Sequence, residues 1–200
     1  MSRYIGPLWR KLRALNLSLP RARNKGSNPP GQHGAKRKRY STYSLQNREI
    51  QKAKTIYGGI RERQLRKLFI KSQKERGKVG DNLLTSLQSR LDNLVFRSGL
   101  VNTLRFARQL VSYKHVLVDG KTINIPSYQL TPGQVISLKK EKMKENKLIV
   151  SNLERNIKFP SYLSFDKQKL VITYLRYPLS EELEKNVNVP LLTEWYNKRI

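Results

Sequence analysis

The N-terminal quarter of the chain places the strongest limit on what can fold. Residues 1–48 contain twelve lysines and arginines and no carboxylate, because the first acidic residue is Glu49. Residues 21–41, RARNKGSNPPGQHGAKRKRYS, hold Gly, Pro, Ser and Asn and almost no apolar side chain to bury. Packing cannot offset the entropy that such a segment loses on ordering. We therefore expect residues 1–43 to form an extended basic arm, not part of a core.

The excess of positive charge extends over the whole chain of 200 residues. It contains 41 Lys and Arg against 14 Asp and Glu, a formal net charge of +27. Such self-repulsion makes a polyanion the natural partner. An anionic membrane is the main alternative, but no apolar run approaches the roughly 20 residues that span a bilayer, and the N-terminus does not resemble a signal peptide. Nucleic acid is favoured, and we expect the arm to order on RNA phosphates, with a solvated tail as the alternative.

Helical periodicity begins after the arm. Ser44 is expected to cap a helix that ends at Gly58-Gly59. The segment IRERQLRKLFIKSQKER, residues 60–76, predicts a second helix with one apolar stripe. We interpret residues 44–88 as a helical domain, completed by a C-terminal segment, residues 151–200, that packs back on it.

Two further helices are predicted to carry a basic face. Asp81 is expected to cap one that ends near Gly99, and Thr103 to cap the next. In each, arginines and hydrogen-bonding side chains share a face at helical spacing, away from the apolar stripe. These residues are Arg90, Asn93 and Arg97 on the first helix, and Arg105, Arg108, Gln109 and Ser112 on the second.

The period then changes from helix to strand. HVLVDGKTINI, residues 115–125, has β-branched residues around Asp119-Gly120 and predicts a tight hairpin. QLTPGQVISLKK, residues 129–140, predicts a turn at Pro132-Gly133 and another strand. The predicted fold is α+β: the extended arm, the helical domain and, over residues 89–150, a small domain of two helices packed on a short, mostly antiparallel sheet.

Side chains that could carry catalysis are few. The chain has no cysteine, which excludes disulfides, thiolate metal sites and cysteine nucleophiles. His33 and His115 do not stand at metal-ligand spacing with other candidates. The carboxylates Glu181, Glu182 and Glu184 favour a solvated helix start over an acid/base pair. We expect no enzyme, no metal and no cofactor.

The basic face suits structured RNA. A-form RNA displays phosphates and 2′-hydroxyls, which arginine forks and short polar side chains can contact. Aromatic residues make up 8 % of the chain and do not alternate with the arginines of residues 90–115, so base stacking is a weak expectation. DNA remains possible because phosphate contacts do not discriminate, although no helix-turn-helix or zinc-finger spacing supports it.

Residues 89–139, SRLDNLVFRSGLVNTLRFARQLVSYKHVLVDGKTINIPSYQLTPGQVISLK, strongly resemble the RNA-binding module named after ribosomal protein S-four. The resemblance continues outside the module and covers nearly the whole chain, although it is weaker in the C-terminal third. It is carried there by SRYIGP, PGQHGAKR, IYGGIRERQLRKLF, GDNLL and LLTEWY. The chain is similar to the small-subunit ribosomal protein S-four family.

That resemblance implies a primary binder of small-subunit ribosomal RNA. Such a protein nucleates assembly of the subunit body and supports translational accuracy near the path by which mRNA enters. The implied partners are this RNA, mRNA, the neighbouring small-subunit protein five and, nearby, small-subunit protein twelve or three. No membrane and no small-molecule substrate are implied. The alternatives are a free chaperone-like RNA binder and an RNA-modifying enzyme that carries the same module.

The resemblance also bears on metal binding and on location. Some relatives bind zinc or an iron–sulfur cluster through cysteines of the arm, and this chain has none. The MSRY start, the shortened arm, the abundance of Lys, Asn and Ile and the lack of a transit peptide favour a plastid (chloroplast) ribosome, with the bacterial cytoplasm as the alternative.

The expected RNA-binding residues fall into two groups. In the arm and the helical domain they are Arg3, Tyr4, Gly6, Pro7, Arg10, Lys11, Gln32, His33, Gly34, Lys36, Arg37 and Arg63. In the small domain they are Arg90, Arg97, Thr103, Arg105, Arg108, Gln109, Ser112, Lys114, His115 and Asn124. Because Arg105 and Arg108 lie off the apolar stripe, changing both to Glu is expected to abolish binding and leave the helix folded.

Overall fold

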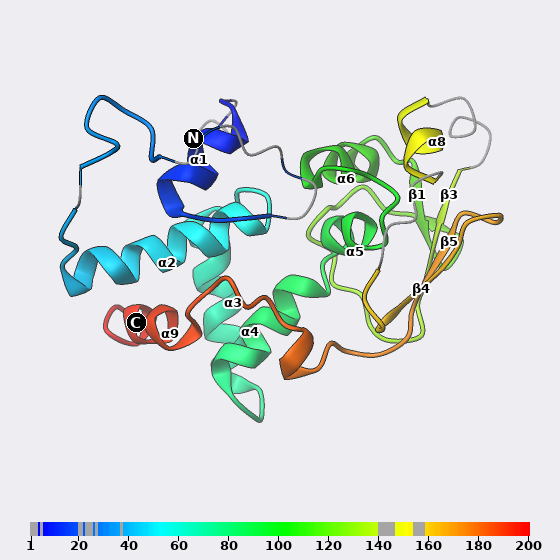
Figure 1. Cartoon of the computed structure of the whole chain (residues 1–200). Coiled ribbons are helices and arrows are strands. Elements are labelled where there is room, and N and C mark those ends of the chain that lie inside the picture. Colours follow the sequence, from blue (N-terminus) through cyan, green and yellow to red (C-terminus); the bar gives the residue numbers. More distant parts are fainter. Residues whose placement is uncertain are drawn as a thin grey trace. The chain divides into compact units, whose positions relative to one another are not determined.

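The chain forms two compact units (Figure 1). One consists of residues 1–84 and 184–200, and the other of residues 85–183. Among the residues that the structure describes, no helix combines the length and the apolar character needed to cross a bilayer. This computed structural model describes residues 4, 6–19, 22, 26, 28–36, 38–139, 147–153 and 159–200.

The first unit is helical. The buried faces of α2 and α9 pack against each other, and Phe69 of α3 stacks on Tyr196 of α9 with ring centroids 4.9 Å apart. Glu49 ties α2 to the start of α9, because its buried carboxylate accepts a hydrogen bond from the Asn188 backbone N–H at 2.8 Å. The helices are α1 (Leu8–Leu15), α2 (Thr42–Ile56), α3 (Glu62–Lys74), the first part of α4 (Val79–Gln88) and α9 (Val189–Asn197).

The N-terminus differs from the sequence prediction in two ways. Helix α2 begins one turn early, because Ser41 and not Ser44 is the cap: the Ser41 hydroxyl accepts from the Ser44 backbone N–H at 3.3 Å. The arm is not extended throughout, since α1 lies within it and buries Leu12. The short amphipathic helix α1 packs on α2, and this packing offsets an ordering entropy that the polar remainder of the arm cannot offset.

The second unit is a five-stranded sheet with helices beside it, which confirms the predicted α+β fold. The strand order is β2-β1-β3-β5-β4, and every neighbouring pair is antiparallel. Helices α5 and α6 lie together on one side of this sheet and share its apolar core (Figure 1). The elements are α5 (Leu91–Arg97), α6 (Leu104–Ser112), β1 (Val116–Val118), β2 (Lys121–Thr122), β3 (Val135–Leu138), α8 (Lys147–Leu153), β4 (Leu163–Asp166), β5 (Val171–Tyr174) and the 3₁₀ turn η1 (Ser180–Glu182).

The predicted hairpin and the strand after it are present. Asp119 and Gly120 have φ angles of 49° and 78°, the left-handed pair that a two-residue hairpin of this type requires. The Asp119 carboxylate accepts hydrogen bonds from the Val135 backbone N–H and the Gln134 side-chain amide, each at 2.9 Å. This one side chain thus joins the hairpin to β3.

The helix predicted from Asp81 to Gly99 is broken in two. Helix α4 ends at Gln88 and α5 begins at Leu91. The Leu91 backbone N–H donates to the Tyr128 carbonyl at 2.8 Å, and Arg90 forms a β-bridge with Gln129. Tertiary hydrogen bonds therefore replace helical ones at the break. Apolar spacing continues through it, so periodicity alone could not reveal it.

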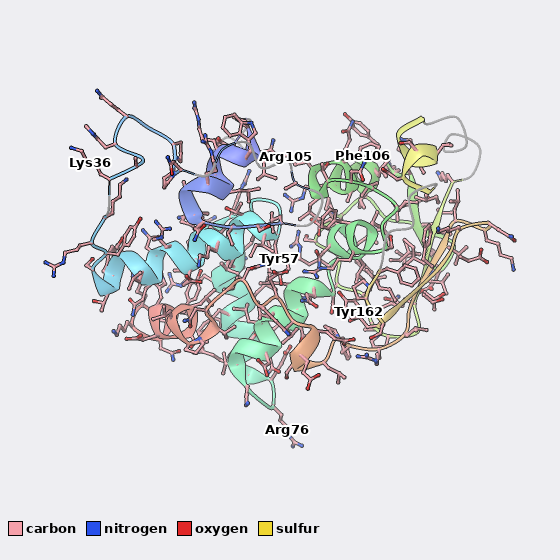
Figure 2. All side chains as sticks on the ribbon, viewed as in Figure 1. Lys36, Tyr57, Arg76, Arg105, Phe106 and Tyr162 are labelled. Carbon is pink, nitrogen blue, oxygen red and sulfur yellow. The ribbon has the colours of Figure 1, made fainter. Side chains whose placement is uncertain are left out.

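The C-terminal third divides differently from the expected segment of residues 151–200. Strand β5 pairs with β3 in the register Ile136↔Ile172, so β4 and β5 complete the sheet of the second unit. Tyr162, which is labelled in Figure 2, and Tyr174 of β5 are fully buried in the core of this unit. Only residues 184–200 belong to the helical unit, because α9 carries the apolar face that covers α2.

Candidate RNA-binding surface

Helix α6 exposes part of the predicted basic face. The Thr103 hydroxyl caps it by accepting from the Phe106 backbone N–H at 3.2 Å. Three residues of its apolar stripe, Ala107, Leu110 and Val111, are buried in the core. Arg105, Gln109 and Ser112 are exposed, and Figure 2 shows Arg105 extending from the side of α6 that faces away from the sheet. Spacing on the helix thus places these three side chains as predicted.

Arg90 is placed differently from the prediction. It is the N-cap of α5 and not a residue of a helix face, and its side chain is 5 % exposed. It donates from Nε to Asp92 Oδ1 at 3.1 Å and from an Nη atom to Asp92 Oδ2 at 2.9 Å. Asn93 is also buried, with its amide donating to the Gln88 carbonyl at 3.0 Å. Of the three residues expected on this face, only Arg97 is partly exposed.

Asp92 joins the two helices through a second arginine. Arg108 donates from Nε and from an Nη atom to Asp92 Oδ2, at 3.1 and 2.9 Å. The carboxylate is 1 % exposed and the Arg108 side chain 14 %. One buried acid between two guanidiniums leaves one net positive charge and fixes the direction of both forks.

The ion pair also overturns one expectation about mutants. Arg108→Glu would place a second carboxylate against Asp92, so this substitution disturbs folding as well as binding. Asp92 had no part in the predicted site. An acid in the Arg-Leu-Asp-Asn motif, among arginines, was the signal that could have identified it.

The chain after α6 carries the remaining predicted contacts of the second unit. Lys114 is exposed, and His115 is half-buried with its ring 6.4 Å from that of Tyr113. The Lys139 backbone N–H donates to the His115 carbonyl at 3.2 Å, which ties this turn to the end of β3. Asn124 is exposed beyond β2.

The arm residues ahead of α1 form a local cluster. The Tyr4 hydroxyl donates to the Pro7 carbonyl at 3.2 Å, and Lys11 Nζ lies 3.9 Å from the centre of the Tyr4 ring. Gly6 passes so close to this ring that an added Cβ would lie 2.6 Å from it. Arg10 is exposed on α1. These contacts hold the Tyr4 side chain in one position, with the Lys11 ammonium group beside its ring.

The predicted PGQHGAKR segment forms a tight turn that requires glycine. The Gly34 backbone N–H donates to the Gly31 carbonyl at 3.0 Å, and a Cβ on Gly34 would lie 1.9 Å from the Pro29 carbonyl oxygen. Gln32 and His33 are exposed on this turn, as is Lys36 after it, which points away from the ribbon in Figure 2. The turn therefore presents the Gln32, His33 and Lys36 side chains to solvent.

The remaining predicted residues fall in the first unit. Arg63 is exposed on α3, while Arg3 and Arg37 lie outside the described residues. The two predicted groups thus belong to different units, and each is a surface of its own unit. In the part of the chain that the structure describes, no three His, Asp or Glu side chains gather as metal ligands.

Comparisons with known proteins account for both units. A family model described as "Ribosomal protein S4/S9 N-terminal domain" matches residues 3–88, and one described as "S4 domain" matches residues 89–136. "Small ribosomal subunit protein uS4" of Geobacillus stearothermophilus is 46 % identical over 99 % of this chain and 100 % of its own length. The chain belongs to the uS4 family.

Other uS4 relatives agree with this assignment. Those of Oceanobacillus iheyensis and Listeria monocytogenes are 45 % and 43 % identical, again over 99 % of this chain and 100 % of their own length. All three of these relatives are bacterial, so they give no support to the expected plastid origin. Family membership confirms the resemblance to ribosomal protein S-four.

Proposed function

We propose that this protein is a structural constituent of the small ribosomal subunit and binds its ribosomal RNA directly. The observation that carries the proposal is end-to-end similarity to uS4, at 46 % identity, across both units. The exposed cations on α6 and on the arm supply the chemistry that this role needs. The ribosome is the location, and the bacterial relatives favour the bacterial cytoplasm as the compartment.

The binding mechanism follows from the way the second unit holds its cations. The apolar stripe of α6 is fixed in the core, so the exposed side of the same helix presents Arg105 and Gln109 at constant spacing. Phosphates of structured RNA are also regularly spaced, and a rigid face loses little conformational entropy on binding them. The protein would bind by shape and charge, and we infer that it acts without catalysis.

The finer role that we propose is early binding during assembly. A protein with two RNA-binding surfaces on separate units can hold RNA segments together and nucleate the subunit body. We further propose that its neighbour in the subunit is small-subunit protein five, with small-subunit protein twelve or three nearby. The basic arm would support translational accuracy near the mRNA path.

Two measurements test the proposal. The protein should co-sediment with small subunits after a high-salt wash. Its affinity for protein-free small-subunit ribosomal RNA should also fall with salt, with a log–log slope of about −0.7 to −0.9 per phosphate neutralised. A flat salt dependence, or equal affinity for random single strands, would contradict direct binding through many phosphates.

A charge reversal locates the surface. Arg105→Glu should weaken binding at least about tenfold, because it replaces a phosphate-binding cation by a repelling anion on a face that stays folded. Lys169→Glu, on the exposed turn before β5, is the matched control with the same change in charge. If both variants lose affinity equally, net charge and not the α6 face governs binding.

A further inference from the structure

Helix α6 ends in an unusually fixed turn. The His115 backbone N–H donates to the Leu110 carbonyl at 3.1 Å, and the Lys114 backbone N–H to the Val111 carbonyl at 3.0 Å. These two bonds, closing six and four residues, are those of a Schellman cap. In such a cap the residue at the position of Lys114 must be left-handed, and its φ is 60°. The turn displays Tyr113, Lys114 and His115 at a defined geometry.

A lysine at this position is a costly choice. Glycine adopts the left-handed conformation freely, whereas a side chain with a Cβ meets the neighbouring carbonyl, so helices usually place Gly there. Strain of this kind is retained at binding sites, where the side chain contributes something that glycine cannot. Here it keeps a cation at the end of the face that carries Arg105 and Ser112.

Tyr113 stands directly before this lysine and is 65 % exposed. Its ring meets that of His115 nearly at right angles, at 84°. The Tyr113 backbone N–H is fixed by a hydrogen bond to the Gln109 carbonyl at 3.0 Å. A large aromatic surface is therefore held open to solvent, on a rigid backbone, beside a cation.

We infer that Tyr113 stacks on an unpaired base of the bound RNA while Lys114 contacts a phosphate of the same strand. The inference rests on the proposed function. Inside an A-form duplex every base face is covered by its neighbours, so an exposed ring can stack only on a base that is looped out or terminal. The site would take a single unpaired nucleotide at the edge of a surface that otherwise reads phosphates.

The inference revises the expectation that stacking is weak on this surface. That expectation followed from the spacing of aromatic residues along the sequence, where Tyr113 stands alone after Ser112. In the structure the helix cap fixes the backbone at Tyr113 and the His115 ring meets the Tyr113 ring at its edge, and one exposed ring is sufficient for one base.

The two roles differ in their dependence on salt, and this difference is the test. Protein-free small-subunit ribosomal RNA is titrated with the full chain and its variants over a range of salt concentrations. Tyr113→Leu keeps a large apolar side chain and loses the flat ring. It should weaken binding about fivefold or more with an unchanged salt slope, whereas Tyr113→Phe should bind like the wild type. Tyr177→Leu, a similar change at another exposed tyrosine of the same unit, should have no effect.

Lys114→Gly separates the charge from the fold. Glycine relieves the left-handed strain, so this variant should unfold at the same temperature as the wild type or higher. It should nonetheless bind more weakly, with a salt slope reduced by about one phosphate, while Lys114→Arg keeps the slope.

Ultraviolet cross-linking locates the base contact. The tryptic peptide of residues 109–114 should carry a nucleotide adduct on Tyr113 after irradiation of the complex. Unchanged affinity of Tyr113→Leu, or a Tyr113→Leu variant whose salt slope falls, overturns the stacking assignment even if the wild type binds. If the wild type shows no salt-dependent binding to this RNA, the proposed function itself fails.

Discussion

Removing the carboxylate of Asp92 should destabilise the second unit more than any ordinary surface change. Asp92→Ala leaves the Arg90 guanidinium, 5 % exposed, without the two hydrogen bonds it donates to this acid. Arg108 loses its two bonds at the same time, but at 14 % exposure it can turn toward water. The main cost is therefore one buried charge without its counter-ion.

The magnitude follows from that burial. Breaking a buried ion pair by removing one partner typically costs about 3–5 kcal/mol. Native domains are stable by only about 5–15 kcal/mol, so the variant would lose a large part of the stability of its unit. For a unit of this size each kcal/mol corresponds to about 4–8 °C in Tm, which gives a fall of about 12 °C or more.

Thermal unfolding followed by circular dichroism measures the effect. Asp166→Ala is the matched control, because this exposed carboxylate at the end of β4 accepts hydrogen bonds from the backbone N–H groups of Gln168 and Lys169, at 2.9 and 3.2 Å, and not from a buried cation. Its loss should cost about 1 kcal/mol. If Asp92→Ala lowers Tm no more than Asp166→Ala does, the ion pair does not hold the unit together and the reasoning fails.

Two further predictions concern packing and pH. A Cβ on Gly80 would lie 2.0 Å from Val189 Cγ1. Gly80→Ala should therefore lower the free energy of unfolding by about 1–3 kcal/mol in denaturant titrations, and adding Val189→Ala should restore the loss. A Gly80→Ala variant as stable as the wild type would contradict this. Hydrogen bonds from Arg176, above all, and from Ser161 and the Leu179 backbone lower the pKa of Glu182 from 4.5 to about 2. The ionised carboxylate stabilises the fold above about pH 4.5, and this contribution is lost as the pH falls toward 2. Glu182→Gln should therefore flatten the dependence of stability on pH in that window. An unchanged pH profile would refute this prediction.

Local rules of sequence were enough to predict much of the second unit. The Asp119-Gly120 pair requires a left-handed turn that few other pairs adopt, and Thr103 is a strong cap; both stand where they were expected. The exposed positions of Arg105, Gln109 and Ser112 follow from helical spacing once the apolar stripe of α6 is known. These features depend on contacts close in sequence.

Features that depend on distant contacts could not be predicted in this way. The break before Leu91 exists because the Tyr128 carbonyl takes its N–H, and a bond across 37 positions leaves no mark on local periodicity. Strand β5 joins β3 for the same kind of reason, through pairing with residues far earlier in the chain. The burial of Arg90 could be predicted only by knowing that the Asp92 carboxylate points toward it.

The buried acid explains how a face rich in arginine can stay ordered before RNA arrives. Two adjacent guanidiniums repel each other and each has many rotamers, but Asp92 removes one unit of charge and fixes both forks with four hydrogen bonds. Because the Arg90 and Arg108 guanidinium groups are bound to Asp92, they are held in place but are less able to reach a phosphate. A variant of Arg108 therefore reports on folding and on RNA at once, whereas Arg105 and Lys114, which are exposed, are the more direct probes of RNA binding.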